Sequence, residues 1–193
     1  MEREPGNENA IWERAKRRVL ILTKDLNDEE AWDIRAETGR NNFSGENNVV
    51  VSAPFYKNLM RWVYGLLTID ANGHAKKFAE IDRQDVYRPF YDQAPVARVN
   101  CKKQVGTSSI ETSVLKSYME RYKDLLVKQI AAYDANILLC CGASGAIKDF
   151  VAENYLTDLL KLNNWVYYSP RTVRWLLTAG IQPIQRYARK NVF

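Results

Sequence analysis

Two unbroken runs of apolar residues constrain the fold of this chain more than any other feature. The runs are Val19-Leu20-Ile21-Leu22 and Ile137-Leu138-Leu139-Cys140-Cys141. A strand with one face in water alternates apolar and polar residues, whereas an unbroken apolar run is typical of a strand buried on both faces. Strands of this kind are characteristic of parallel sheets that are covered by helices. The two runs therefore favour an α/β fold.

Further strand and helix patterns alternate along the chain. Strands are predicted at residues 96–101 and around residues 165–168, and helical spacing of apolar residues begins at Pro54 and again near Ser144. Strands that alternate with helices form βαβ units. We therefore expect a three-layer α/β/α architecture with a central four-stranded parallel sheet. No change of composition marks a domain boundary, so residues 1–193 are predicted to form a single domain.

Composition excludes several classes of protein. The chain has no apolar run of about 18 residues, so no membrane partner is expected. The N-terminal sequence MEREPGNENA has no apolar core and does not resemble a secretory signal. The spacing of Cys101, Cys140 and Cys141 fits neither a disulfide framework nor a CxxC metal site. We expect an intracellular, cytoplasmic protein with neither a metal nor a cofactor.

Basic residues are concentrated in the C-terminal segment. The segment 161–193 contains no acidic residue, and its basic residues are Lys161, Arg171, Arg174, Arg186, Arg189 and Lys190. The same segment holds the aromatic residues Trp165, Tyr167, Tyr168, Trp175 and Tyr187. Cations neutralise phosphates and rings stack on bases, so this mixture predicts a nucleic-acid surface. The alternative is a charged segment that only keeps the protein soluble.

Three polar loops are candidates for a functional site. Ligands of an open parallel sheet bind beyond the carboxyl ends of its strands, which selects residues 23–28, 100–106 and 168–171. We expect Asp25 and Asn100 to lie side by side there, where a carboxylate can polarise water and an amide can read a base. The alternative roles are local, because Asp often caps a helix and Asn often binds loop backbone.

Other catalytic motifs are weak or missing. Gly142-Ala143-Ser144-Gly145 is a strand-to-helix turn that could hold a phosphate, but it lacks the GxGxxG pattern and the Lys-Ser/Thr pair of a P-loop. The chain has no GxSxG elbow, and its single histidine, His74, follows no predicted strand. A hydrolase triad is therefore not expected.

Taken in order, these segments resemble the uracil-DNA glycosylase superfamily. Val19–Asp25 is similar to the family's first strand and catalytic loop, and Phe55-Tyr56-Lys57-Asn58-Leu59 to its Phe-Trp-Lys helix start. Val96–Asn100 is similar to the strand that ends in a base-reading Asn, and Ile137–Gly142 to the third strand. The final His-Pro-Ser motif would fall on Tyr168-Ser169-Pro170-Arg171.

The resemblance implies a DNA glycosylase that acts in base excision repair. Such a protein flips a modified or mismatched base out of DNA and hydrolyses its N-glycosidic bond. The resemblance makes Asp25 the catalytic residue. It assigns the remaining contacts to two groups: the base would be bound by Asn100, Phe55 and Tyr168, and the DNA backbone by Ser169, Arg171 and Arg174.

Two other functions remain open from the sequence. Leu26 stands where the family has proline and Tyr168 where it has histidine, which favours a catalytically weak or inactive nucleic-acid-binding module of the same fold. An enzyme that acts on a free nucleoside or nucleotide would share the parallel sheet and the Gly142 turn. Strong salt dependence of DNA binding would distinguish the two DNA-binding alternatives from this third one.

Overall fold

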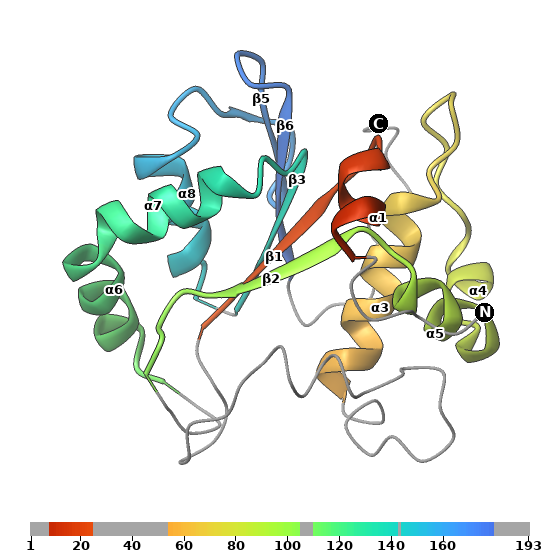
Figure 1. Ribbon diagram of the computed structural model, residues 1–193, viewed down its shortest axis with the longest axis horizontal. Coiled ribbons are helices and arrows are strands. Elements are labelled where there is room, and N and C mark those ends of the chain that lie inside the picture. Colours follow the sequence, from red (N-terminus) through yellow and green to blue (C-terminus); the bar gives the residue numbers. More distant parts are fainter. Residues whose placement is uncertain (1–7, 25–53, 105–109, 143, 180–193) are drawn as a thin grey trace. The chain divides into compact units, whose positions relative to one another are not determined.

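The computed structural model describes residues 8–24, 54–104, 110–142 and 144–179, which fall into two compact units (Figure 1). The helical unit includes the described residues 8–15 and 54–95, and the sheet unit includes the described residues from 16 to 24 and from 96 to 179. The single domain that the sequence suggests for residues 1–193 stays a prediction.

The helical unit is built around one amphipathic helix. Its helices are α1 (Glu8–Arg14), α3 (Pro54–Leu67), α4 (Phe78–Ile81) and α5 (Gln84–Asp92). Proline favours the first position of a helix, where its missing N–H costs nothing, so α3 begins at Pro54 as the sequence predicts. Met60 and Tyr64 of α3 form a buried cluster with Ile81 and Tyr87 from α4 and α5.

The sheet unit contains a six-stranded mixed sheet with the order β2-β1-β3-β6-β5-β4. Four neighbouring strands run parallel: β2 (Val96–Asn100), β1 (Val19–Thr23), β3 (Ile137–Cys141) and β6 (Arg174–Ala179). The other two, β5 (Val166–Ser169) and β4 (Leu160–Lys161), are antiparallel to their neighbours. Every residue of β1 is buried, which agrees with its unbroken apolar sequence.

The α/β class is therefore confirmed, but the prediction of a four-stranded parallel sheet is wrong. The strand expected as the fourth parallel strand, around residues 165–168, is the antiparallel strand β5. Only the turn at residues 170–173 separates β5 from β6. A parallel connection needs a crossover of about a dozen residues, so this short turn permits only an antiparallel pair. The three-layer arrangement of helices stays a prediction.

The helices of the sheet unit lie on one side of its sheet (Figure 1). They are α6 (Thr112–Arg121), α7 (Lys123–Ala132) and α8 (Ala146–Asn154). Helix α8 packs against β3 and β6, and α6 and α7 pack against α8. The buried residues of α8, which are Ala146, Ile147, Phe150 and Val151, form one helical stripe. This stripe holds the start of α8 close to the carboxyl ends of β3 and β6.

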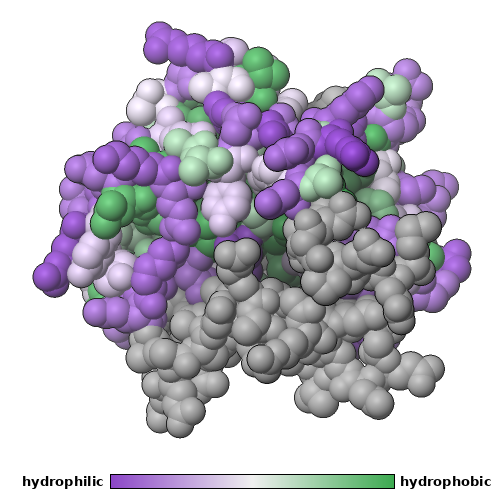
Figure 2. Space-filling model, viewed as in Figure 1, coloured by the Kyte–Doolittle hydropathy of each residue, from purple (hydrophilic) through white to green (hydrophobic). Residues whose placement is uncertain are grey.

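The visible surface over these helices is mostly hydrophilic, with small hydrophobic patches (Figure 2). Two of their large apolar side chains, Val114 and Leu125, are 50% and 67% exposed. Within the described ranges, none of the helices has the length and apolar character that a membrane span requires.

Candidate functional site

The carboxyl ends of the four parallel strands meet at one edge of the sheet, which we call the carboxyl edge. Strand β1 lies between β2 and β3, so the order of the strands reverses between β1 and β3. In open α/β sheets, ligands bind beyond the carboxyl ends at such a reversal. The carboxyl edge is therefore the first place to look for a functional site.

Thr23 and Asn100 form a buried polar pair at this edge. They are the last residues of β1 and β2 and lie opposite each other in the sheet. Only 7% of Thr23 and 4% of Asn100 are exposed. The Thr23 hydroxyl donates a hydrogen bond to Oδ1 of Asn100. Thr23 lies in one of the loops that the sequence selects, but its role emerges only from this pairing across the sheet.

Backbone hydrogen bonds extend this pairing beyond the strand ends. The amide of Cys101 donates to the Thr23 carbonyl at 2.8 Å, and the amide of Lys102 donates to the Lys24 carbonyl at 2.7 Å. Both loops therefore start side by side on a rigid base. Asp25 follows Lys24 in the sequence but lies outside the described residues.

The Asn100 side chain retains a hydrogen-bond donor. Within the described part of the chain, its one side-chain hydrogen bond is the one that Oδ1 accepts, which leaves both N–H groups of Nδ2 available. A ligand that accepts a hydrogen bond from Nδ2 would therefore find a donor at this edge.

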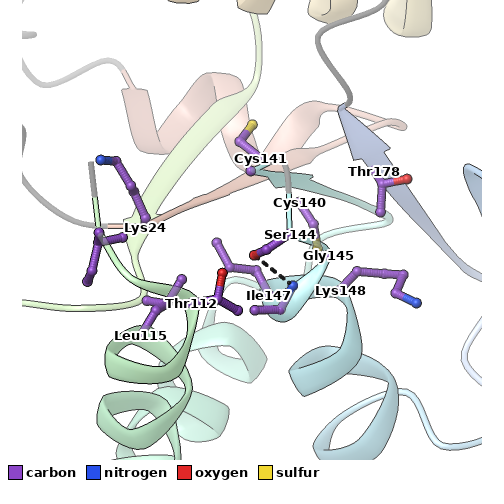
Figure 3. Close-up of a pocket in the computed structure, with 13 residues that line it drawn as sticks. Lys24, Thr112, Leu115, Cys140, Cys141, Ser144, Gly145, Ile147, Lys148 and Thr178 are labelled. Carbon is purple, nitrogen blue, oxygen red and sulfur yellow. Dashed lines mark hydrogen bonds between the residues drawn. The ribbon is translucent and has the colours of Figure 1, made fainter. Parts of the chain in front are cut away.

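A pocket of about 320 Å³ lies at the same edge, between the strand ends and the start of α8 (Figure 3). The strands contribute Cys140 and Thr178 to its lining. Lys24 follows the last residue of β1, and Lys148 comes from the first turn of α8. No carboxylate occurs among the described residues that line this pocket, although Asp149 forms an ion pair with Lys148.

The turn before α8 depends on glycine. Gly142 has a φ of 143° and Gly145 a φ of 70°, and both values favour a residue without a Cβ atom. The Ser144 hydroxyl accepts a hydrogen bond from the Ala146 amide at 3.4 Å (Figure 3). The glycines thus let the chain turn sharply from β3 into α8, above the pocket.

The buried pair and the pocket lie on opposite faces of the sheet. Leu22, Cys140 and Thr178 are in register across β1, β3 and β6, so their side chains share the face covered by α8. Thr23 is the next residue after Leu22, and its side chain therefore points to the other face, together with that of Asn100. The carboxyl edge therefore has the pocket on the face covered by α8 and the Thr23–Asn100 pair on the other face.

The cysteines at this edge are not activated. Burial raises the pKa of Cys101 and of Cys141 to about 12, and it raises the pKa of Cys140 as well. All three therefore remain thiols at neutral pH, which argues against a cysteine nucleophile because the thiolate is the reactive form. Among the described residues, no cluster of His, Cys, Asp and Glu could hold a metal ion.

Lys148 is a charged residue with defined contacts. Its Nζ lies 2.5 Å from Oδ1 of Asp149 and 5.4 Å from the centroid of the Tyr167 ring. The hydrogen bond to Asp149 raises the pKa of Lys148, so this lysine keeps its positive charge. It is a residue that the sequence analysis missed, because only the packing of α8 against the sheet brings it to the pocket.

Tyr168, Ser169, Arg171 and Arg174 lie at the opposite edge, which we call the amino edge. Because β5 runs antiparallel to β6, Ser169 at the end of β5 pairs with Arg174 at the start of β6. The expectation that residues 168–171 share the edge of Asn100 is therefore wrong. It assumed that β5 was a parallel strand.

The amino-edge residues are engaged in contacts within the protein. Ser169 is fully buried and donates to Oδ1 of Asp158 at 2.6 Å, and the Arg171 amide donates to Oδ2 of the same carboxylate at 2.9 Å. Arg174 forms an ion pair with Asp134. The Tyr168 ring lies 4.7 Å from that of Trp175. These contacts stabilise a turn and a strand end.

Phe55 belongs to the helical unit, where it lies in the first turn of α3. It is 43% exposed, and its ring centroid lies 5.2 Å from that of Tyr56 in an edge-to-face arrangement. An exposed ring of this kind is available to stack on a base. Arg186 and Lys190, which the sequence analysis also counts in the basic segment, lie outside the described residues.

Comparison of the chain with protein-family models, with curated proteins and with solved structures finds no match. The resemblance to the uracil-DNA glycosylase superfamily therefore stays a hypothesis that rests on the order of the segments. The geometry of the carboxyl edge is the basis on which a function can be proposed.

Proposed function

We propose that this protein binds DNA, receives an unstacked modified or mismatched base at the carboxyl edge, and hydrolyses the N-glycosidic bond of that base. The observation that carries the proposal is the buried Thr23–Asn100 pair, whose amide nitrogen is left as a hydrogen-bond donor. A base removed from its stack has exposed edges that such an amide can read.

The charge of the pocket supports a nucleic-acid ligand. Lys24 and Lys148 line it, and its described lining holds no carboxylate that would repel a phosphate. Each phosphate that a lysine neutralises releases bound counterions, which favours association at moderate salt. The lysines of the pocket therefore suit a phosphate, and the Asn100 amide, on the other face of the sheet, suits a base.

Asp25 is proposed to carry the chemical step. As the bond between C1′ and the base nitrogen breaks, its electron pair leaves with the base, and positive charge develops on the sugar. The Asp25 carboxylate stabilises this charge and orients a water molecule that adds to C1′. The carboxylate accepts the proton that this water loses, and the departing base takes up a proton from solvent. Asn100 donates a hydrogen bond to the departing base.

A second candidate function is DNA binding without catalysis, through the same fold. The observation that favours it is the position of Tyr168 and Arg171 at the amino edge, which removes the final motif of the glycosylase resemblance from the proposed site. A protein of this kind would bind an unstacked base and leave its glycosidic bond intact.

The experiment that tests the proposal separates cleavage from binding. Oligonucleotides that contain uracil, hypoxanthine or mismatched thymine are incubated with the protein and then heated in alkali, which breaks the strand at abasic sites. The proposed hydrolysis predicts strand breaks at the modified or mismatched position. Salt-dependent binding without breaks would support the non-catalytic function, and the absence of both would contradict both functions. Cleavage of free nucleosides alone would indicate a small-molecule enzyme.

A further inference from the structure

We propose that Lys103 is a catalytic residue for a second reaction at the carboxyl edge. In this reaction its amine forms an imine with the sugar of an abasic site, and the DNA strand breaks on the 3′ side of that site. The inference rests on the proposed binding of DNA at this edge, and its substrate is the product of the proposed hydrolysis. Lys103 lies in the loop 100–106, and the glycosylase resemblance assigns no role to it.

The backbone on both sides of Lys103 is anchored at the carboxyl edge. On one side, the amide of Lys102 donates a hydrogen bond to the Lys24 carbonyl at 2.7 Å. On the other side, the Gln104 carbonyl accepts a hydrogen bond from Nζ of Lys102 at 3.2 Å. Lys103 is the third residue after Asn100, at which β2 ends. Three residues of chain span at most about 11 Å, so Lys103 lies near the amide proposed to bind the base.

The side chain of Lys103 is free to contact a ligand. It is exposed, and within the described parts of the chain it forms neither a hydrogen bond nor an ion pair. Two other lysines at this edge differ from it. The amine of Lys102, which is a buried residue, donates to a backbone carbonyl, and Lys148 forms an ion pair with Asp149.

The surroundings of Lys103 also favour the reactive form of its amine. An amine adds to a carbonyl carbon only when it is neutral, because a protonated amine has no lone pair. Lys103 is exposed as a residue, but partial burial of its amine lowers the pKa of this group. Burial disfavours the charged form and so increases the neutral fraction. Lys103 therefore combines access to a ligand with an increased fraction of the nucleophile.

The abasic site supplies the group that such an amine attacks. Its sugar opens to an aldehyde at C1′, the neutral amine adds to this carbon, and loss of water followed by uptake of a proton gives a protonated imine. Solvent then removes a proton from C2′, and the electron pair of that bond forms the double bond between C2′ and C3′. The phosphate on C3′ leaves with the electron pair of its C–O bond. Water finally hydrolyses the imine, which releases the unsaturated aldehyde and the Lys103 amine.

The test uses an oligonucleotide that already contains one abasic site, so it does not depend on the proposed hydrolysis. Borohydride reduces an imine to a stable amine and thereby links the protein covalently to the DNA. A denaturing gel detects the linked product, and mass spectrometry of the linked peptide identifies the residue. We expect a product linked at Lys103, and strand breaks at the abasic site when borohydride is omitted.

Lys103→Arg separates the chemistry from the charge. Arginine keeps a positive charge for DNA binding, but it stays protonated and forms no imine. We therefore expect this variant to lose the linked product completely and to retain its affinity for the oligonucleotide. Lys128→Arg, the same change at an exposed lysine of α7, is the matched control and should give the product of the wild-type protein. Melting temperatures check that both variants are folded.

The outcomes separate this inference from the proposed hydrolysis. A product linked at another residue, a product that persists in Lys103→Arg, or no linked product with the wild-type protein would overturn the role of Lys103. Cleavage at uracil without a linked product would contradict the second reaction and leave the hydrolysis intact. A product linked at Lys103 without cleavage at uracil would contradict the hydrolysis and support the second reaction.

Discussion

The two edges of the parallel strands in the sheet unit differ in what their polar groups contact. At the amino edge, carboxylates and arginines are joined to one another, and Asp134 forms ion pairs with both Arg18 and Arg174. At the carboxyl edge, the amide nitrogen of Asn100 has no hydrogen-bond partner among the described residues, and a pocket lined by Lys24 and Lys148 lies on the other face of the sheet. Ser169 and Arg174 at the amino edge are engaged within the protein, whereas the Asn100 amide nitrogen at the carboxyl edge can still bind a ligand.

This difference changes how the basic residues of the chain should be interpreted. The sequence places Arg171 and Arg174 in a segment without acidic residues, which favours a role in DNA binding. In the structure, Arg174 pairs with Asp134, which is 40 positions away in the sequence, and the Arg171 backbone is held by Asp158. The count of charges in a segment therefore does not give the charge that is available for a phosphate.

Among the variants that test the difference between the two edges, Asp25→Asn is expected to have the largest effect. If the carboxyl edge is catalytic, this change removes the charge that stabilises the developing cation and lowers the cleavage rate a hundredfold or more, about 2.7–4 kcal/mol in the barrier. DNA affinity should remain nearly unchanged, because the charge acts mainly in the transition state. Single-turnover cleavage measures the rate, with Asp134→Asn at the amino edge as the matched control. Equal losses in both variants would contradict the assignment.

A smaller effect is expected for Asn100→Ala. Removing the amide deletes the donor to the base, and the loss of a buried hydrogen bond of this kind costs about 1–3 kcal/mol. Affinity for an oligonucleotide with mismatched uracil should therefore fall by about tenfold or more. Ser169→Ala at the amino edge is the control, because Ser169 is also buried and hydrogen-bonded, and it should change thermal stability alone. Weaker uracil binding by Ser169→Ala would contradict the assignment of base binding to the carboxyl edge alone.

Charge reversal sharpens the comparison further. The double change Lys24→Glu and Lys148→Glu should weaken DNA binding and reduce the dependence of log K on log salt by about one for each phosphate that is no longer neutralised. Arg171→Glu at the amino edge reverses the charge of an exposed residue, and it should leave this dependence unchanged. Fluorescence anisotropy at several salt concentrations measures the slope. If Arg171→Glu reduces the slope and the lysine changes do not, DNA binds at the amino edge instead.

The smallest effect is expected for the stability of the amino edge at acid pH. Hydrogen bonds from Arg174 and Arg18 lower the pKa of Asp134 below its ordinary value of 3.8. A lowered pKa contributes stability above the unfolded-state value, and this contribution disappears as the pH falls through the folded-state value. Because Asp134 is 63% exposed, Asp134→Asn should cost only about 1 kcal/mol at neutral pH.

Urea unfolding of the wild-type protein and of Asp134→Asn measures this contribution. The difference between their free energies of unfolding should shrink toward zero as the pH falls well below 3.8. Asp85→Asn is the control, because Asp85 has a lowered pKa from an exposed contact with Arg83 and lies outside the amino edge. A difference that is independent of pH would show that the Asp134 charge does not stabilise this edge.

Local patterns in the sequence are sufficient to determine several elements of the fold. The unbroken apolar runs become β1 and β3 because a strand without polar residues is stable only when both of its faces are covered. The helix after Pro54 forms where apolar residues recur at helical spacing. The strand predicted at residues 96–101 is β2, which ends one residue earlier, at Asn100.

The tertiary structure alone decided which of these residues meet. Thr23 and Asn100 are 77 positions apart in the sequence, and Arg18 and Asp134 are 116 apart. No local pattern encodes such a contact, because it depends on the order and direction in which strands join the sheet. The same reason explains the wrong placement of Tyr168 and Ser169. Periodicity identifies β5 as a strand, but its direction follows from the short turn into β6, and that direction decides at which edge its residues lie.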